Sequence, residues 1–478
     1  MPPLSRSLHR MNDPSPLFAA LRERADPDAT AAIEQLVKSG TDSELARINA
    51  LAFAAARGLD EEKTIATFLH AAQLGVFELS WDVICPTCRG VLHITHTLKD
   101  VHREPYDCAL CGRSFEVSLD ELVEIVFTVS PRVRRIAAHD PTTLPFWDYY
   151  RQVYWSTAVD LSDDDLKRLI GEFTLFAREL APGEEATTKA EVPEGWVLLF
   201  DPVSHFGHYL KIAPERTSDV QQVKVTLRGT RAPTETTQLK AGPLRLTVAN
   251  STAERALPVA WLETKAYDEL VGKRRPHLTA KRIFTNQTFR DLYRTDTLAI
   301  DQGLKIVSLT FLFTDLKGST DLYARVGDLA AYELVREHFQ LLNASVAREG
   351  GAVVKTIGDA VMATFPSPDR ALAAAFAMRG SIGSVGGTRR EDLIVKIGIH
   401  EGPCVAVMLN DRLDYFGQTV NIAARVQGLA TEQAIFATRP AVENPESAAL
   451  LAKAGLTPVP QSVRLKGVAG EVAVYEIP

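Results

Sequence analysis

The chain has 478 residues, which is more than one compact core usually holds, so two to four domains are expected. Apolar residues make up 46% and charged residues 24%, which excludes a disordered or fibrous protein and indicates a soluble globular one. The 53 basic and 60 acidic side chains give a net charge of −7, which argues against wrapping of nucleic acid by the whole chain.

Residues 1–80 are predicted to form a helical segment. The N-terminus has a few basic residues with no apolar stretch behind them, so it does not resemble a signal peptide. No apolar run approaches the ~20 residues that span a bilayer, so we expect a cytoplasmic protein without membrane insertion. Apolar residues recur with helical spacing in INALAFAAA and TIATFLHAAQLGVF. Short helices in this arrangement resemble a winged-helix or helix-turn-helix module, many of which serve only as protein contacts.

Residues 81–135 contain four of the five cysteines, as the pairs Cys85-Pro-Thr-Cys88 and Cys108-Ala-Leu-Cys111. Two CxxC turns at this separation can direct four sulfurs toward one tetrahedral Zn²⁺. Buried thiols or a redox CxxC are the alternatives. We therefore predict a zinc ribbon with a structural Zn²⁺ bound by Cys85, Cys88, Cys108 and Cys111, whereas the isolated Cys404 is predicted to be an ordinary buried thiol.

Residues 136–265 are predicted to form a mostly β regulatory domain, a small sandwich or barrel. Between Trp196 and Glu263, strand-like segments alternate with turn-rich ones. The stretch DDDLKRLIGEFTLFAREL (163–180) predicts a helix. Residues 266–304 are predicted to be a linker with a lead-in helix, TFRDLYRTDTL. Contact with nucleic acid or lipid is the alternative for the basic run KRRPHLTAKR within it.

Residues 305–478 show the clearest pattern of strands and helices in the sequence. A buried strand ends at Asp315, a long helix ends at Gly350, and a hairpin turns around Gly358. An alanine-rich helix and the strand LIVKIGIH follow. The order β-α-β-β-α-β predicts a ferredoxin-like sheet with helices on one face, so the whole chain is expected to be a multidomain α+β protein.

Five segments of this region occur in the order FTDLKGST, KTIGDAVMATF, KIGIHEGP, DYFGQTVNIAARV and RLKGVAGEVAVYEI. Together they resemble the catalytic domain of class III nucleotidyl cyclases over residues 306–478. The upstream region, with its CxxC pairs, is similar to the N-terminal region of a bacterial cyclase group that carries a domain of unknown role. The resemblance implies an adenylate cyclase, a phosphorus–oxygen lyase that converts ATP to 3′,5′-cyclic AMP and pyrophosphate under control of its N-terminal half.

Asp315 and Asp359 are the predicted metal ligands. Attack of the 3′-hydroxyl on the α-phosphorus develops charge at both ends of the displacement, which two divalent ions can stabilise. Mg²⁺, or Mn²⁺ in its place, suits carboxylates combined with phosphate oxygens. The alternative roles are a helix N-cap for Asp315 and a turn residue for Asp359. The resemblance adds the backbone carbonyl of Leu316 as a ligand, and the backbone N–H groups of Gly318, Ser319 and Thr320 are predicted to bind the phosphates.

Lys355 and Asp414 are the predicted base-reading residues. Adenine presents an acceptor at N1 and a donor amine at N6, so a lysine and an aspartate match it. Guanine carries a donor at N1 and an acceptor at O6, so it would mismatch both the lysine and the aspartate. The resemblance places the family's base-reading lysine and aspartate at these two positions, which favours ATP over GTP.

Asn421 and Arg425 lie four residues apart, so on a helix they share one face. The resemblance implies that Asn421 orients the ribose and that Arg425 stabilises charge on the α-phosphate. The alternative role is a helix cap for Asn421 and a surface salt bridge for Arg425. Lys466 matches a lysine that contacts the terminal phosphates. Lys396 stands where the family usually has an arginine that assists pyrophosphate, and it keeps the charge but loses the bidentate fork.

The resemblance also implies a homodimer. In the family, the metal aspartates and the base-reading residues of one site come from different chains, and this chain carries both sets. We expect an unknown regulatory ligand or protein at the N-terminal half and no nucleic-acid partner. The other functions left open are a guanylate cyclase, an inactive cyclase-fold nucleotide sensor and a DNA-binding regulator acting through residues 15–135.

Overall fold

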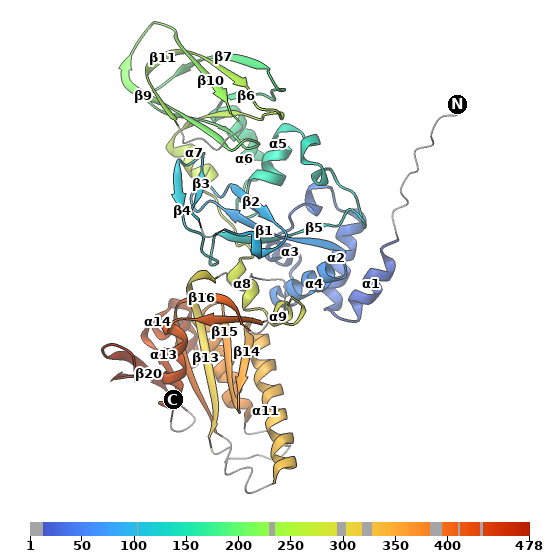
Figure 1. Cartoon of the computed structure of the whole chain (residues 1–478), viewed down its shortest axis with the longest axis vertical. Coiled ribbons are helices and arrows are strands. Elements are labelled where there is room, and N and C mark those ends of the chain that lie inside the picture. Colours follow the sequence, from blue (N-terminus) through green and yellow to red (C-terminus); the bar gives the residue numbers. More distant parts are fainter. Residues whose placement is uncertain are drawn as a thin grey trace. The chain divides into compact units, whose positions relative to one another are not determined.

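The chain folds into two compact units, which the computed structural model shows in Figure 1. Unit 1 comprises Met1–His96, His102–Val117 and Glu124–Leu278, and unit 2 comprises Thr97–Val101, Ser118–Val123 and Thr279–Pro478. The structure describes residues 13–102, 104–228, 235–293, 303–317, 327–382, 394–409, 412–430 and 434–478. Within these ranges, no helix is both long and apolar enough to cross a membrane.

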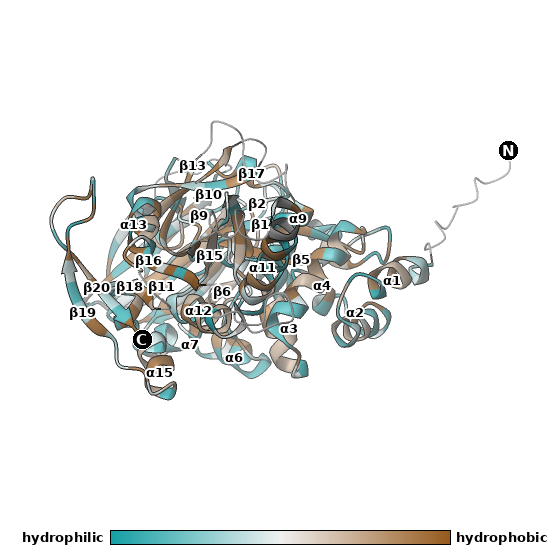
Figure 2. Cartoon of the chain, turned by 90° about the horizontal axis from the view of Figure 1, so that it is seen from below, coloured by the Kyte–Doolittle hydropathy of each residue, from teal (hydrophilic) through white to brown (hydrophobic). Residues whose placement is uncertain are grey.

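Unit 1 begins with four α-helices. Asp26, Asn49 and Asp60 cap three of them by accepting hydrogen bonds from backbone N–H groups of the first turn. Polar and apolar colours alternate around these helices in Figure 2, as expected for amphipathic helices that bury one face. The helices are α1 (Ser15–Arg22), α2 (Pro27–Ser39), α3 (Ala50–Arg57) and α4 (Glu61–Gln73).

A three-stranded sheet follows the helices, with strand order β2-β1-β5. Its strands are β1 (Phe77–Ile84), β2 (Val91–Thr95) and β5 (Val123–Val129). Between β2 and β5 lies a small hairpin of β3 (Tyr106–Cys108) and β4 (Arg113–Phe115). The β1–β2 loop carries the first CxxC pair and the β3–β4 hairpin the second, so the topology brings two distant cysteine pairs together.

The helix predicted over residues 163–180 is shorter than expected, and this part of the prediction was wrong. Helix α6 (Asp163–Arg168) continues as a π-helical turn to Phe173, and the next residues form strand β6 (Thr174–Ala177). The strand pairs antiparallel with β12 (Val259–Glu263). Because that partner is far along the chain, tertiary pairing overrides the local helical pattern.

The β-rich part of unit 1 is a seven-stranded sheet with strand order β10-β11-β9-β8-β12-β6, and β7 pairs with β11. The first part of β11 runs parallel to β9, and its second part pairs with β7 and β10. Buried residues from all seven of these strands form one core. The remaining strands are β7 (Glu185–Val192), β8 (Gly195–Asp201), β9 (Phe206–Arg216), β10 (Gln221–Leu227) and β11 (Glu235–Asn250), followed by helix α7 (Lys265–Val271).

Unit 2 is built around an eight-stranded sheet of order β14-β15-β13-β16-β18-β20-β19, with β17 paired to β16. Its first elements alternate as strand, helix, strand, strand, helix, strand. The elements are α8 (Ala280–Phe284), α9 (Gln287–Leu292), β13 (Gly303–Lys317), α11 (Asp328–Arg348), β14 (Ala352–Ile357), β15 (Ala360–Phe365), α12 (Pro368–Ile382), β16 (Ile394–Leu409), β17 (Arg412–Phe416), α13 (Gln418–Gln427), β18 (Ile435–Thr438), α14 (Arg439–Glu443), α15 (Pro445–Lys453), β19 (Val459–Val463) and β20 (Val472–Ile477).

The two faces of this sheet carry different elements. Leu312 and Leu316 of β13 pack in one core with residues of α11, α12, α14 and α15. On the other face, Val426 of α13 packs against Phe436 of β18. Side chains alternate between faces along a strand, so Asp315, beside Leu316, points to the α13 face.

A short segment from the middle of the unit 1 sequence belongs to unit 2. The backbone N–H of Leu119 donates to the carbonyl of Lys305 at 3.0 Å. Asp120 accepts hydrogen bonds from the backbone N–H groups of Val307 and Ser308, at 2.5 and 3.1 Å. The chain therefore leaves unit 1 and returns to it before it enters the remainder of unit 2.

Candidate functional site

Asp315 lies near the end of β13, directly opposite Lys396 of β16. Its side chain is 36% exposed, and its Oδ2 lies 4.0 Å from Lys396 Nζ. Burial, and then the charge of Asp359, raise the pKa of Asp315, while Lys396 opposes that rise. The two predicted metal ligands are therefore close enough to influence each other electrostatically.

Asp359 occupies the turn between β14 and β15. The preceding Gly358 adopts a φ of 65°, which a glycine tolerates and most residues do not. Oδ2 of Asp359 is buried and has no hydrogen-bond partner among the described residues. An unpaired buried acceptor costs about 1–3 kcal/mol, and a cation held by both carboxylates would satisfy it. The donor set and this unpaired oxygen fit a Mg²⁺ or Mn²⁺ site.

The predicted phosphate loop can be described only in part. Leu316 follows Asp315 in β13, and its side chain is buried in the helical core. Its backbone carbonyl stays a predicted ligand. Gly318, Ser319 and Thr320 lie outside the described residues.

Lys355 and Asp414 form a direct ion pair, with 2.6 Å between Nζ and Oδ2. Lys355 comes from β14 and is 41% exposed, whereas Asp414 comes from β17 and is 8% exposed. The backbone N–H of Tyr415 donates to the other oxygen of Asp414 at 2.8 Å. The structure thus brings together two residues that are far apart in sequence and holds the aspartate in place.

Arg290 supports this pair, and sequence reasoning missed it. It lies on α9, within the predicted lead-in helix TFRDLYRTDTL. Its guanidinium donates to the carbonyl of Leu413 at 2.5 Å and to the Tyr415 hydroxyl at 3.5 Å. These contacts fix β17 on either side of Asp414. No motif marks Arg290, because its partners lie more than a hundred residues away.

Asn421 and Arg425 lie on α13, as predicted from their spacing. Asn421 is exposed and Arg425 is half-buried. A Cβ atom at Gly467 would stand 3.5 Å from the Arg425 guanidinium, an ordinary contact distance, so the guanidinium lies beside this glycine. The exposed Lys466 precedes Gly467, so the structure brings Arg425 close to the loop that carries Lys466.

Two further residues near the aspartates were not found from the sequence. Gln427, at the end of α13, lowers the pKa of Asp315 by hydrogen bonding and so opposes the effect of burial. His338 of α11 is 1% exposed, and neither ring nitrogen has a hydrogen-bond partner among the described residues. Burial lowers the pKa of His338 to about 4. Neither residue belongs to a motif that would reveal it.

The four predicted zinc ligands form one cluster in unit 1. Their sulfur atoms all lie within 4.8 Å of one another, and none forms a disulfide. Four sulfurs placed ~2.3 Å from a tetrahedral zinc would lie about 3.8 Å apart. The Cys85–Cys111 and Cys88–Cys108 distances are 3.8 and 3.6 Å. Backbone N–H groups of Thr87 and Gly90 donate to Cys85 and Cys88, each at 3.4 Å. The cluster fits a Zn²⁺ ion.

Cys404 is separate from this cluster. It is buried in β16, and burial raises the pKa of its thiol to about 12. A protonated buried thiol agrees with the predicted structural role.

Comparison with known families divides the sequence into two parts. Residues 11–291 match a family described as "Family of unknown function (DUF5939)". This match covers more than half of the chain. The chain belongs to the DUF5939 family. Residues 304–472 match the "Adenylate and Guanylate cyclase catalytic domain", so this family member carries a class III nucleotidyl cyclase domain in its C-terminal part.

Several curated proteins resemble parts of this chain. An adenylate cyclase from Anabaena cylindrica is 29% identical over 188 residues, or 35% of this chain and 36% of that protein. Adenylate cyclase 2 of Rhizobium meliloti (strain 1021) is 35% identical over 132 residues, or 25% of this chain and 36% of that protein. The chain therefore spans about a third of the length of these two relatives.

Solved structures also overlap with this chain. The crystal structure of the adenylyl cyclase CyaB from P. aeruginosa covers 37% of this chain and 96% of its own, with 22% identity and a TM-score of 0.32. A likeness at that TM-score adds no argument to the family match.

Proposed function

We propose that this DUF5939 protein is an adenylate cyclase that converts ATP into 3′,5′-cyclic AMP and pyrophosphate. The observation that carries the proposal is the Lys355–Asp414 pair, with its Nζ–Oδ2 distance of 2.6 Å. A lysine donor beside an aspartate acceptor matches N1 and N6 of adenine and mismatches guanine at both positions. Because Asp414 is nearly buried, a mismatched base would leave a buried acceptor unpaired.

The reacting end of the site is proposed to lie at Asp315 and Asp359. These carboxylates would hold Mg²⁺ or Mn²⁺, which when bound would neutralise charge on the attacking and leaving oxygens. In the free chain, Lys396 offsets part of the negative charge of Asp315. The strand order β14-β15-β13-β16 supports a ferredoxin-like unit, in which neighbouring strands bring the two aspartates together.

The remaining polar residues are proposed to act on the ribose and phosphates. Asn421 is exposed on α13 and would orient the ribose. Arg425 and Lys466 would place positive charge beside the α-phosphate and the terminal phosphates. The position of the Arg425 guanidinium beside Gly467, the residue that follows Lys466, supports joint action of these two cations. Lys396 would contribute charge to pyrophosphate departure, and the backbone N–H groups of 318–320 would bind phosphate oxygens.

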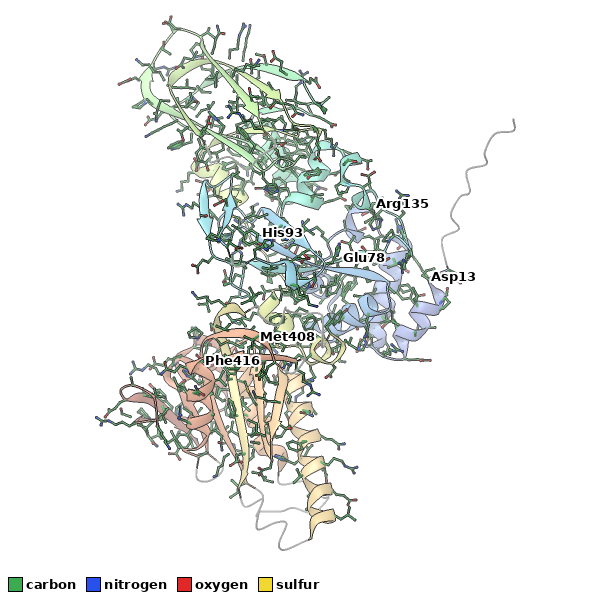
Figure 3. All side chains as sticks on the ribbon, in the orientation of Figure 1. Asp13, Glu78, His93, Arg135, Met408 and Phe416 are labelled. Atoms are coloured by element: carbon green, nitrogen blue, oxygen red, sulfur yellow. The ribbon has the colours of Figure 1, made fainter. Side chains whose placement is uncertain are left out.

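We propose that two copies of the chain assemble into a homodimer with composite sites. Unit 2 exposes large apolar side chains on adjacent strands. Val405 and Leu409 of β16 are 39% and 43% exposed, and Phe416 of β17, labelled in Figure 3, is 54% exposed. Val405 and Phe416 are paired residues of the two strands. Burying such side chains against a second copy would be favourable.

The N-terminal half is proposed to regulate the enzyme. The four-cysteine cluster would hold a structural Zn²⁺ that completes a zinc ribbon in unit 1. A cytoplasmic location remains part of the proposal, since it keeps these thiols reduced and available for the metal.

Product analysis tests the proposed activity. Purified full-length protein is incubated with ATP or GTP in the presence of Mg²⁺ or Mn²⁺, and products are identified by mass. We expect cyclic AMP and pyrophosphate from ATP, and loss of both when Asp315→Ala is used as the control. Cyclic GMP as the main product would assign a guanylate cyclase instead. Absence of product from both nucleotides would favour an inactive nucleotide sensor.

A further inference from the structure

A cavity of about 580 Å³ opens in unit 1, within the DUF5939 region. It lies between the first helices and the segment 148–163, and none of the four clustered cysteines lines it. Sites for small molecules usually measure about 300–1,000 Å³. The size of this cavity therefore suits a small organic ligand, and nothing in the cyclase chemistry uses it.

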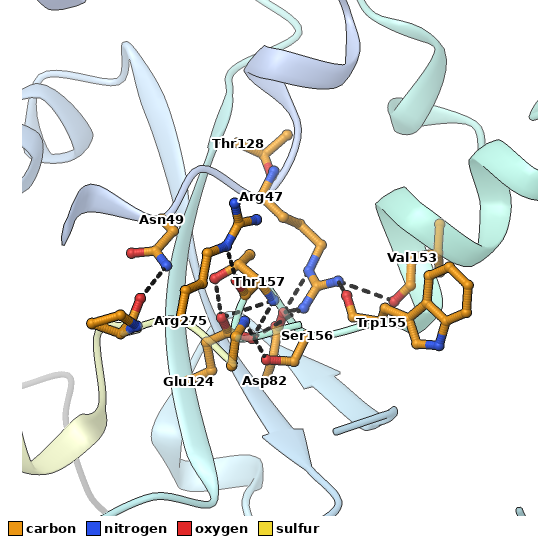
Figure 4. Close-up of polar contacts among 12 residues, drawn as sticks. Arg47, Asn49, Asp82, Glu124, Thr128, Val153, Trp155, Ser156, Thr157 and Arg275 are labelled. Carbon is orange, nitrogen blue, oxygen red and sulfur yellow. Dashed lines mark hydrogen bonds and ion pairs between the residues drawn. The ribbon is translucent and has the colours of Figure 1, made fainter. Parts of the chain in front are cut away.

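Arg47 lines the cavity and is held in place by hydrogen bonds and ion pairs (Figure 4). Its Nε donates to buried Asp82 at 2.8 Å, and its Nη2 lies 3.4 Å from buried Glu124. Its Nη1 donates to the carbonyls of Trp155 and Val153, at 2.8 and 3.2 Å. The backbone of Arg47 has a φ of 45°, a conformation that L-residues rarely adopt and that clusters at functional sites.

The same network of hydrogen bonds also holds Thr157, another residue that lines the cavity. Glu124 accepts hydrogen bonds from both the hydroxyl and the backbone N–H of Thr157, the latter at 3.1 Å. The carbonyl of Thr157 in turn accepts from Nε of Arg275 at 2.7 Å (Figure 4). A cavity whose walls are already fixed loses little entropy when a ligand enters, which favours binding.

Two arginines in the cavity retain unused positive charge. Arg57 stacks over the Phe53 ring at 3.9 Å and forms none of the ion pairs among the described residues. Arg275 uses Nε for Thr157, and its nearest carboxylate, Asp160, lies 4.0 Å away at an exposed position. Guanidinium groups with free N–H donors bind carboxylate or phosphate in a bidentate manner.

Two other charged groups of the cavity, Arg151 and Glu44, already have partners. Arg151 pairs with Asp163 at 2.7 Å. Glu44 accepts hydrogen bonds from the backbone N–H and the hydroxyl of Thr41, at 2.8 and 2.9 Å. Neither pair therefore needs a ligand. Arg57 acts on Glu44 through its charge without forming an ion pair, and Arg275 lies 4.0 Å from Asp160, so both arginines keep guanidinium N–H donors for a ligand.

A hydrogen-bond acceptor without a partner lines another part of the cavity. Oε1 of Gln152 is buried and unpaired among the described residues. Asp148 lies four residues earlier, where helix α5 (Phe146–Tyr149) continues as a π-helical turn through Tyr154, and it forms no ion pair in the described structure. π-helical turns occur frequently at functional sites. An amino or hydroxyl group of a ligand would satisfy both acceptors.

We propose that this cavity binds a small organic molecule that carries a carboxylate or phosphate together with an amino or hydroxyl donor. Arg57 and Arg275 bind the anionic group, and Gln152 and Asp148 accept hydrogen bonds from the donor. The site belongs wholly to unit 1, so it is distinct from the nucleotide site proposed in unit 2. Its ligand is a candidate for the unidentified input to the N-terminal half.

Calorimetric titration of the full-length protein tests this site with three probes: a mixture of L-amino acids, adenosine monophosphate and inorganic phosphate. The first two combine an anion with an amino donor and distinguish an amino-acid ligand from a nucleotide ligand. We expect at least one of them to bind, and Arg57→Gln and Arg275→Gln each to weaken that binding about tenfold or more. Arg168→Gln is the matched control, because Arg168 is exposed outside the cavity and paired with Glu172. It should leave binding unchanged.

Gln152→Leu separates the two halves of the proposed site. It should weaken the organic probe while leaving any binding of inorganic phosphate unaltered, because phosphate needs only the arginines. Far-UV circular dichroism checks that each variant folds. The proposal is overturned if no probe binds up to millimolar concentration, or if binding survives the double substitution of Arg57 and Arg275.

Discussion

Lys355 and Asp414 are the two side chains that we propose select the base of the substrate. Each satisfies the other in the free chain, with Nζ and Oδ2 2.6 Å apart. Adenine would offer the lysine an acceptor and the aspartate a donor, so both remain paired when the base enters. The backbone N–H of Tyr415 donates to the aspartate, and Arg290 bonds to the neighbouring residues Leu413 and Tyr415, so the pair stands on a strand that is held in place.

A double substitution tests base selection. Lys355→Glu supplies an acceptor for N1–H of guanine, and Asp414→Ser removes the carboxylate that would repel O6. We expect the ratio of kcat/KM for ATP to that for GTP to fall about tenfold or more, equivalent to at least ~1.4 kcal/mol. Both values are measured with the metal held constant. Lys453→Glu makes the same charge change as Lys355→Glu at an exposed position of α15, and it should leave the ratio unaltered. An unchanged ratio in a folded, active double variant would contradict base recognition by this pair.

Sequence reasoning at this scale grouped residues where a motif or a family resemblance existed, and the structure brings these residues together, while their roles stay predictions. The four cysteines, the two aspartates and the Lys355–Asp414 pair come from such patterns. Arg290, Gln427 and His338 were missed, because their relevance arises only when distant segments pack. No local signal distinguishes a buried histidine beside a carboxylate from an ordinary helix residue.

Helix α13 illustrates how one element depends on a single small residue elsewhere. A Cβ atom at Gly398 of β16 would stand 2.1 Å from the backbone nitrogen of Gln427, closer than real atoms approach. The helix that carries Asn421 and Arg425 therefore rests directly on strand backbone. The predicted strand KIGIH contains this glycine, but the sequence could not show that a helix packs on it.

Gly398→Ala is expected to displace α13. Overpacking of this kind costs ~1–3 kcal/mol in the free energy of unfolding, which chemical denaturation measures. Cyclase activity should fall much more than the folded fraction does, because Asn421 and Arg425 move with the helix. Gly380→Ala is the matched control: a Cβ there meets nothing within 4 Å, so this helix substitution should be neutral or stabilising. Full activity of a folded Gly398→Ala protein would contradict the role of α13.

The cysteine cluster joins the β1–β2 loop to the β3–β4 hairpin. We expect about one Zn²⁺ per chain in protein purified under reducing conditions, measured by elemental analysis. Cys88→Ser should abolish stoichiometric zinc and lower the melting temperature of unit 1. Cys404→Ser changes a buried thiol outside the cluster and should retain the zinc. Absence of zinc from the wild-type protein would eliminate the ribbon.

Association of two chains is the property of the whole molecule that the proposed chemistry requires. The metal aspartates would serve one site, and Asn421 and Arg425 would complete the other. Exposed Phe416 and its neighbours on β16 supply an apolar surface for the second copy. The sequence predicted this only through resemblance, because one chain cannot reveal what covers its surface.

Mixing two inactive variants tests the composite site. Asp315→Ala and Arg425→Ala proteins should each be nearly inactive. After subunit exchange, half of the dimers are mixed and each holds one intact site, so about a quarter of wild-type activity should return. A mixture of Asp315→Ala with Asp359→Ala is the control and should stay inactive, because both defects fall in the same half of the site. Failure to complement despite demonstrated exchange would indicate sites built within one chain.

The segment 118–123 has a consequence for the modularity of this protein. It lies between the second cysteine pair and β5, yet Leu119 and Asp120 bond to the first strand of the catalytic unit. A gene fragment that begins near residue 300 would omit it and leave Val307 and Ser308 without their acceptor. The two halves are therefore not independent cassettes, and an exchange of N-terminal regions between members of this family would have to carry this segment along.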